Sequence, residues 1–135
     1  MSLLYLSTSD PLSTAARRVF DALAVTNWEE HYSDNYPGGG YFCGGAGAFE
    51  VKVSQESPDD PFYDEFQVLV FIDIPSTLPT PPDEVAELAA VELLHVGFRV
   101  AEELDFNEHR VRWRVFSLDT TGKLQTNTLE RDLPT

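Results

Sequence analysis

The segment over residues 66–74, Phe-Gln-Val-Leu-Val-Phe-Ile-Asp-Ile, constrains the fold more than any other part of the chain. Consecutive apolar residues occupy its middle, so an extended segment here would be apolar on both faces. A short run of this kind is typical of a central strand that is covered on both sides. Residues 49–54 instead alternate between apolar and polar side chains, which indicates a half-buried strand.

Two segments have the periodicity of helices that could cover such a sheet. In the first, Ser9 and Asp10 offer capping side chains, and Pro11 suits the first helical position. The apolar stripe of this helix consists of Leu12, Ala16, Val19, Phe20 and Leu23. The second helix is predicted to begin at Pro82 and to stop before Gly97. We expect it to be the more buried helix, because it is apolar around most of its girth.

The last two predicted strands, over residues 98–106 and 109–118, form a hairpin with its turn at Asn107 and Glu108. Arginines alternate along the second strand and carboxylates lie on the first, so we choose the register in which opposite charges face each other. That register pairs Asp105 with Arg110, Glu103 with Arg112, and Ala101 with Arg114. The arginine row is therefore interpreted as a charge ladder on a solvated face, in which Arg114 lacks a carboxylate partner. In the alternative interpretation the row holds a phosphate or carboxylate ligand, with Arg114 as the first candidate.

The predicted order of elements is α-β-β-α-β-β, with a short additional strand over residues 123–129. Consecutive hairpin strands favour antiparallel pairing, and the helices then cover the sheet together. We therefore predict a single α+β domain over residues 1–135, with a mostly antiparallel sheet and two helices packed on one face.

The formal net charge of −14 results from 23 carboxylates set against nine lysines and arginines. Such a surface repels nucleic acid and anionic membranes and speeds encounters with basic proteins, although solubility alone could explain it. Cys43 is the only cysteine, which excludes an intrachain disulfide and suits a reducing compartment. The first residues lack a basic flank and a long apolar run, so no signal peptide is expected and the cytoplasm is the default location.

The loop over residues 57–65 is the leading candidate for a binding surface. Aromatic side chains anchor protein interfaces and charges steer association, and this loop interleaves the two kinds. The candidate partner-binding residues are Asp59, Asp60, Phe62, Tyr63, Asp64 and Glu65. In the alternative interpretation, Phe62 and Tyr63 fold back onto the core and the carboxylates only solvate the loop.

A second candidate is the segment over residues 38–47, which holds six of the eight glycines. Glycines let backbone N–H groups approach an anion, but the segment matches neither a phosphate-binding loop nor a dinucleotide fingerprint. We expect a flexible loop that leads into a bulged strand. If a ligand pocket forms between this loop and the sheet, its candidate residues are Tyr41, Cys43 and Arg114. Cys43 would act as a nucleophile only with a histidine beside it.

Recognised catalytic and metal-binding motifs are absent from the sequence. Glu29, Glu30, His31 and Asp34 carry metal-binding groups, but they match no ligand spacing and are interpreted as a solvated acidic turn. No hydrolase elbow, kinase signature, zinc-protease helix or calcium loop occurs, which removes the strongest reasons to propose an enzyme. We expect no metal and no cofactor.

These observations favour a non-catalytic, acidic protein-binding module that engages a basic partner protein, as inhibitors, immunity proteins and secretion chaperones of similar size and charge do. The alternative is a small-molecule-binding protein or enzyme with a pocket between the sheet and residues 38–47. A DNA mimic is a third hypothesis, but the carboxylates are scattered over every segment rather than arranged in a stripe. No nucleic-acid or membrane partner is expected.

Overall fold

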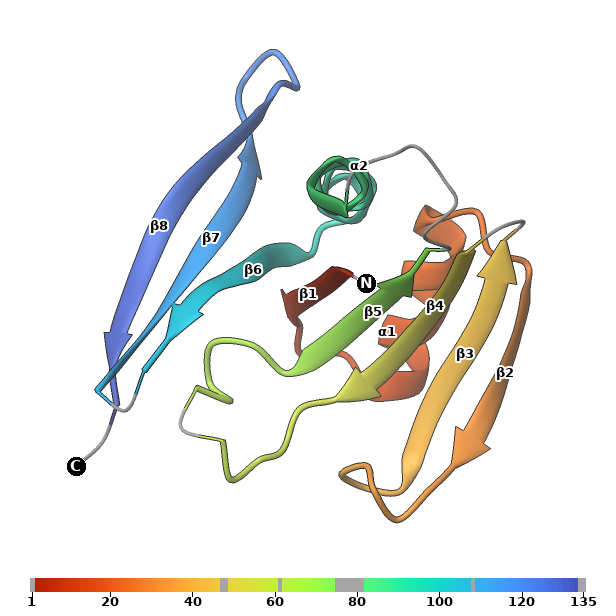
Figure 1. Cartoon of the computed structure of the whole chain (residues 1–135). Coiled ribbons are helices and arrows are strands. Elements are labelled where there is room, and N and C mark those ends of the chain that lie inside the picture. Colours follow the sequence, from red (N-terminus) through yellow and green to blue (C-terminus); the bar gives the residue numbers. More distant parts are fainter. Residues whose placement is uncertain (1, 47–48, 61, 75–81, 108, 134–135) are drawn as a thin grey trace.

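The fold is α+β and is built around one antiparallel sheet, as predicted (Figure 1). This computed structural model describes residues 2–46, 49–60, 62–74, 82–107 and 109–133. The elements in chain order are β1 (Ser2–Ser7), α1 (Leu12–Ala22), β2 (Asn27–Tyr32), β3 (Gly40–Ala46), β4 (Phe49–Gln55), β5 (Val68–Asp73), α2 (Pro82–His95), β6 (Arg99–Phe106), β7 (Arg110–Leu118) and β8 (Leu124–Asp132). Across the sheet the strands follow the order β2-β3-β4-β5-β1-β6-β7-β8.

Strand β1 joins the two halves of the sheet. It pairs antiparallel with β5 on one side and with β6 on the other, so that Leu4 lies beside Val70 and Leu6 beside Val100. The predicted order lacked β1, β2 and β3. The alternation in β1 spans only six residues, and β2 and β3 are rich in acidic residues and glycine, which are poor strand formers. The short strand predicted over residues 123–129 is the longer β8.

Both helices pack on one face of the sheet, as predicted. Helix α1 contacts β3 and β4, helix α2 contacts β1, β6 and β7, and the two helices touch each other. The main core lies between the helices and the sheet, and it includes Phe20 from α1, Leu93 from α2 and Ile72 from β5. The expectation that α2 is the more buried helix is wrong, since each helix buries four of its described residues and Leu88 of α2 is 61% exposed.

The opposite face of the sheet carries a smaller, second core. Its buried members are Phe66, Ala101, Val111 and Trp113. The connection from β4 to β5 runs across this face towards β6 (Figure 1). Strand β5 lies in the interior of the sheet, as predicted, but its outward residues Leu69 and Phe71 are only half-buried.

Most of the glycine-rich segment forms strand β3 instead of the expected loop, while Gly47 lies outside the described residues. Gly44 lies opposite Trp28 of β2. A Cβ atom at Gly44 would lie 2.7 Å from the Cβ of Trp28 and 2.7 Å from Cγ1 of Val25, so any side chain here would force the surrounding packing to shift. The indole of Trp28 stacks there on the ring of Phe20, with ring centroids 5.2 Å apart.

The hairpin of β6 and β7 differs in register from the prediction. The N–H of Asn107 donates to the carbonyl of Arg110 at 2.9 Å, which closes the turn later than predicted, and a β-bulge at Leu104 shifts the register again. The observed pairs are Asp105 with Arg112, Glu103 with Trp113, Glu102 with Arg114, and Ala101 with Val115. The predicted pairs are wrong because the turn closes one residue later and the bulge then shifts the register. Two opposite-charge pairs form in the new register, while alternate residues of β7 enter the second core. Glu108, predicted in the turn, lies outside the described residues.

The start of α1 also differs from the prediction. Pro11 occupies the N-cap position, and no side chain caps the helix. The carboxylate of Asp10 instead pairs with Arg18 at 2.5 Å, and Arg18 also donates to the carbonyl of Val96 after α2. Asp10 is therefore engaged in linking the two helices and is not free to cap.

Candidate functional site

The predicted binding loop is folded tightly by its own backbone. Successive turns are closed by N–H to carbonyl hydrogen bonds from Asp60 to Ser57, from Tyr63 to Asp60 and from Glu65 to Phe62, at 2.9 to 3.1 Å. The carboxylate of Asp60 also accepts the N–H of Phe62 at 2.8 Å. These bonds hold the loop in a defined shape over the second core.

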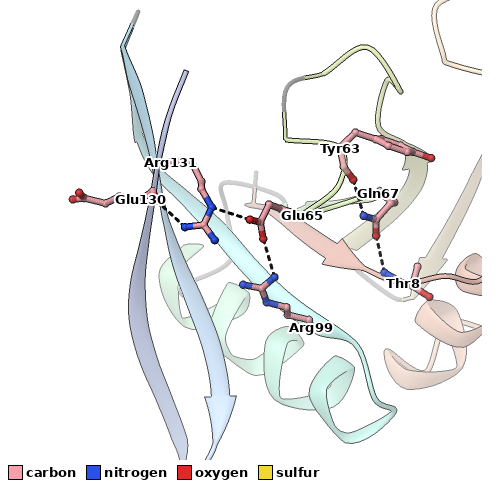
Figure 2. A network of polar contacts seen from close by, with 7 residues as sticks. All are labelled: Thr8, Tyr63, Glu65, Gln67, Arg99, Glu130 and Arg131. Carbon is pink, nitrogen blue, oxygen red and sulfur yellow. Dashed lines mark hydrogen bonds and ion pairs between the residues drawn. The ribbon is translucent and has the colours of Figure 1, made fainter. Parts of the chain in front are cut away.

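Glu65 fastens the end of the loop to the sheet (Figure 2). Its carboxylate accepts hydrogen bonds from Arg99 of β6 at 3.1 Å and from Arg131 of β8 at 2.8 Å. Burial opposes ionisation of Glu65, but the two guanidinium groups outweigh it and hold the pKa of this carboxyl below its usual range. The charge of Glu65 is thus neutralised inside the molecule.

The aromatic side chains of the loop lie against the protein. Phe62 packs edge-on against Trp113, with ring centroids 5.0 Å apart and planes at 83°. The hydroxyl of Tyr63 accepts a hydrogen bond from Gln55 at 2.9 Å, and the carbonyl of Tyr63 accepts one from Gln67 at 2.6 Å (Figure 2). Phe62 and Tyr63 have therefore folded back onto the sheet, as in the alternative interpretation of this loop.

The six predicted partner-binding residues fall into two groups. Asp59 and Asp64 are exposed to solvent. The half-buried members are Asp60, Phe62, Tyr63 and Glu65. The exposed carboxylates are therefore directly accessible, whereas the half-buried residues are accessible only where the surface opens.

Such an opening lies between the loop and the sheet, as a pocket of about 250 Å³. Its lining residues are Tyr5, Glu56, Asp60, Phe62, Phe66, Glu103, Val111, Trp113 and Leu133. Asp60 and Phe62 were predicted from the sequence, whereas Glu56, Glu103 and Trp113 were missed. Glu103 and Trp113 are directly paired across β6 and β7, so the correct hairpin register would have placed both on this face.

The pocket is strongly acidic, since its described lining holds three carboxyl groups and no basic side chain. Burial raises the pKa of Glu56, and the negative charges of Asp60 and Glu103 raise it further. The hydrogen bond from the N–H of Ser57 lowers this pKa but does not cancel the rise. The hydroxyl of Tyr5 donates to Glu103 at 2.9 Å, and burial followed by this carboxylate raises the pKa of Tyr5. Both shifts result from partial desolvation in the presence of uncompensated negative charge.

The structure does not bring together the second predicted set, Tyr41, Cys43 and Arg114. Tyr41 and Cys43 lie on β3, several strands away from β7, which carries Arg114 on the helix-covered face. Cys43 lies between Glu29 and Lys52 in register rather than beside a histidine, and burial raises the pKa of its thiol. These residues therefore share no pocket, and the thiol has the opposite of the activation that a nucleophile needs.

The arginine row forms a charge ladder, but its partners differ from those predicted, and Arg114 lies half-buried beneath α2 instead of on a solvated face. Arg114 pairs with Glu87 of α2 at 3.3 Å and with Glu102 at 3.4 Å. Arg112 pairs with Asp105 at 2.8 Å and with Glu130 at 3.1 Å. Arg114 therefore does not lack a carboxylate, and neither arginine is available to hold an anionic ligand.

A larger groove of about 530 Å³ lies between the end of α1, α2 and the sheet. Its described lining residues are apolar except for Glu92, which carries a carboxyl group. These residues offer burial but no set of polar groups that could orient a ligand or carry out chemistry.

Comparisons with protein-family models, with curated proteins and with solved structures find nothing that matches this chain. Within the described ranges, no helix has the length and apolar character needed to cross a membrane. In the same part of the chain, no three His, Cys, Asp or Glu side chains lie close enough together to hold a metal ion. The geometry of the acidic pocket and its loop is therefore the basis for a functional assignment.

Proposed function

We propose that this chain is a non-catalytic protein-binding module that engages a basic partner through the loop over residues 57–65. The observation that carries the proposal is the pocket beneath this loop, where Glu56, Asp60 and Glu103 gather without a basic neighbour in the described lining. Two arginines lie close by, but both are bound to Glu65. The charge left at the pocket is available to another molecule.

The surroundings of the pocket favour a protein partner. Asp59 and Asp64 add exposed carboxylates to the same loop, and the whole chain carries a net charge of −14. Such a field steers a basic protein towards this surface and repels polyanions. The tight backbone turns of the loop reduce the ordering cost of binding.

Affinity capture with matched variants tests the proposal. The site variant combines Asp59→Asn, Asp60→Asn and Asp64→Asn, and the amide oxygen introduced at position 60 can still accept the N–H of Phe62 and preserve the loop. Glu65 stays unchanged because it fastens the loop to the sheet. The control variant makes the same change at three exposed positions elsewhere, namely Asp21, Asp34 and Asp73.

We expect the wild type and the control variant to retain a stoichiometric basic protein from the native lysate, and the site variant to lose it. Both variants carry the same net charge, so a difference between them reports the loop rather than overall acidity. Equal retention by all three proteins, or retention of acidic proteins only, would contradict the assignment.

A further inference from the structure

We infer that the acidic pocket receives one lysine or arginine side chain of the basic partner. The inference rests on the proposed function and assigns the pocket as the point of insertion. The carboxylates of Glu56, Asp60 and Glu103 would pair with the cation, and the rings of Phe62, Phe66 and Trp113 would pack along its alkyl stem.

The spacing of the carboxylates favours an organic cation. Within the described residues no three carboxylate, histidine or cysteine side chains can share a metal ion, although three carboxyl groups line this pocket. An ammonium or guanidinium group carries several N–H donors that point in different directions, so it can reach carboxylates that are too far apart to share one metal ion. The pocket volume of about 250 Å³ equals that of about eight water molecules, at ~30 Å³ each in the liquid, so a basic side chain has room.

The aromatic lining supports the same kind of occupant. Trp113 meets Phe62 and Phe66 at centroid distances of 5.0 and 5.2 Å, both in edge-to-face geometry. Rings inclined at 83° and 61° to Trp113 present aromatic faces and edges around one space, and cations are attracted to the faces. Carboxylates combined with such rings suit a group that is charged at its tip and apolar along its stem.

Trp113 adds an independent indication of a ligand. The residue lines the pocket, is only 2% exposed, and its indole Nε1 has no hydrogen-bond partner in the described part of the chain. A buried N–H without an acceptor is unfavourable, so an acceptor that reaches it stabilises the bound state. A peptide brings main-chain carbonyl acceptors together with its basic side chain, which a bare metal ion or simple ammonium ion does not.

The inference is tested with single-residue probes and the indole NMR signal of Trp113. The probes are N-acetyl-lysine methylamide and N-acetyl-arginine methylamide, and N-acetyl-norleucine methylamide is the neutral control of similar shape. We expect saturable shifts of the Trp113 indole resonance with at least one cationic probe and none with norleucine. The indole of Trp28, which packs against α1, serves as an internal reference.

Two matched double variants separate the pocket from general acidity. Glu56→Gln with Glu103→Gln removes two pocket charges and keeps acceptors for Ser57 and Tyr5. Asp59→Asn with Asp64→Asn removes two exposed charges outside the pocket lining. We expect the pocket variant to bind the probes at least about ten-fold more weakly, as expected for loss of a charge-assisted bond, and the loop variant to change little.

Three results would overturn the inference: no indole shift with either cation, an equal shift with norleucine, or equal affinity in the pocket variant. Its failure is distinguishable from failure of the proposed function. If the pocket variant, with an unchanged NMR fold fingerprint, still captures the basic protein, insertion is wrong while partner binding by the loop stands. If the probes bind but no basic protein is captured, the pocket recognises a cation and the proposed function fails.

Discussion

Gly44 shows how one missing side chain determines the packing of two strands on α1. A Cβ at this position would lie 2.7 Å from atoms of both Trp28 and Val25, and overpacking of this kind costs about 1–3 kcal/mol. We therefore expect Gly44→Ala to lower the Tm by roughly 3–10 °C. Gly45→Ala is the matched control, because its Cβ would meet only the carbonyl of Phe49 at 3.7 Å. Thermal unfolding followed by circular dichroism compares the two, and equal Tm values would contradict the steric account.

Glu56 makes stability depend on pH, because burial raises its pKa in the folded protein. Above that pKa the ionised carboxylate is less well solvated in the folded state than in the unfolded state, which destabilises the folded protein. Glu56→Gln removes this charge and should therefore raise the Tm at about pH 7. The gain should shrink as the pH falls through the raised pKa and vanish below the ordinary value of 4.5, where both states are protonated. Asp59→Asn controls for the loss of one exposed charge. A gain of the same size at about pH 4 would show that burial of the charge is not its cause.

The two helices end in the same backbone motif with different residues at its left-handed position. Ala24 has φ 58° after α1, and Gly97 has φ 96° after α2. Because alanine pays about 1 kcal/mol in this region and glycine does not, Ala24→Gly should stabilise the protein by about 0.5–1 kcal/mol. The reverse change, Gly97→Ala, should destabilise by a similar amount, because alanine is unfavourable at positive φ. No clash adds to this cost, since the new Cβ would meet only Arg18, at an ordinary contact distance of 3.5 Å. Chemical denaturation checks both signs, and destabilisation by Ala24→Gly would refute the motif argument.

The β6–β7 hairpin marks the limit of what charge patterning can predict. Opposite charges do face each other, but the pairing depends on where the turn closes and on the bulge at Leu104. The hydrogen bonds that Asn107 accepts in the turn, from the N–H groups of His109 and Arg110, place the closure later than a symmetric turn would. A bulge is hard to recognise in a sequence, because its extra residue interrupts the alternation of inward and outward side chains without a characteristic residue type. Leu104, 44% exposed, is such a residue.

For the molecule as a whole, hydrophobic periodicity predicted the class, both helices and their common face. It did not predict β1, the strand that joins the halves, because a short alternation near the start of a chain is ambiguous. Part of the candidate site followed from the loop composition, through Asp60 and Phe62. Glu103 and Trp113 could not be assigned to it without the sheet topology, since β6 and β7 meet the loop only in three dimensions, whereas Glu56 directly precedes the predicted loop and was left outside it.

The association rate of the captured basic protein, measured against ionic strength, tests most directly whether the acidic loop and its pocket receive that partner. The wild type and the Asp21, Asp34 and Asp73 control variant should show a steep fall in rate with added salt, because charges near the contact steer the encounter. The variant at Asp59, Asp60 and Asp64 should associate more slowly with a flatter salt dependence. Identical slopes for all three proteins would contradict the account.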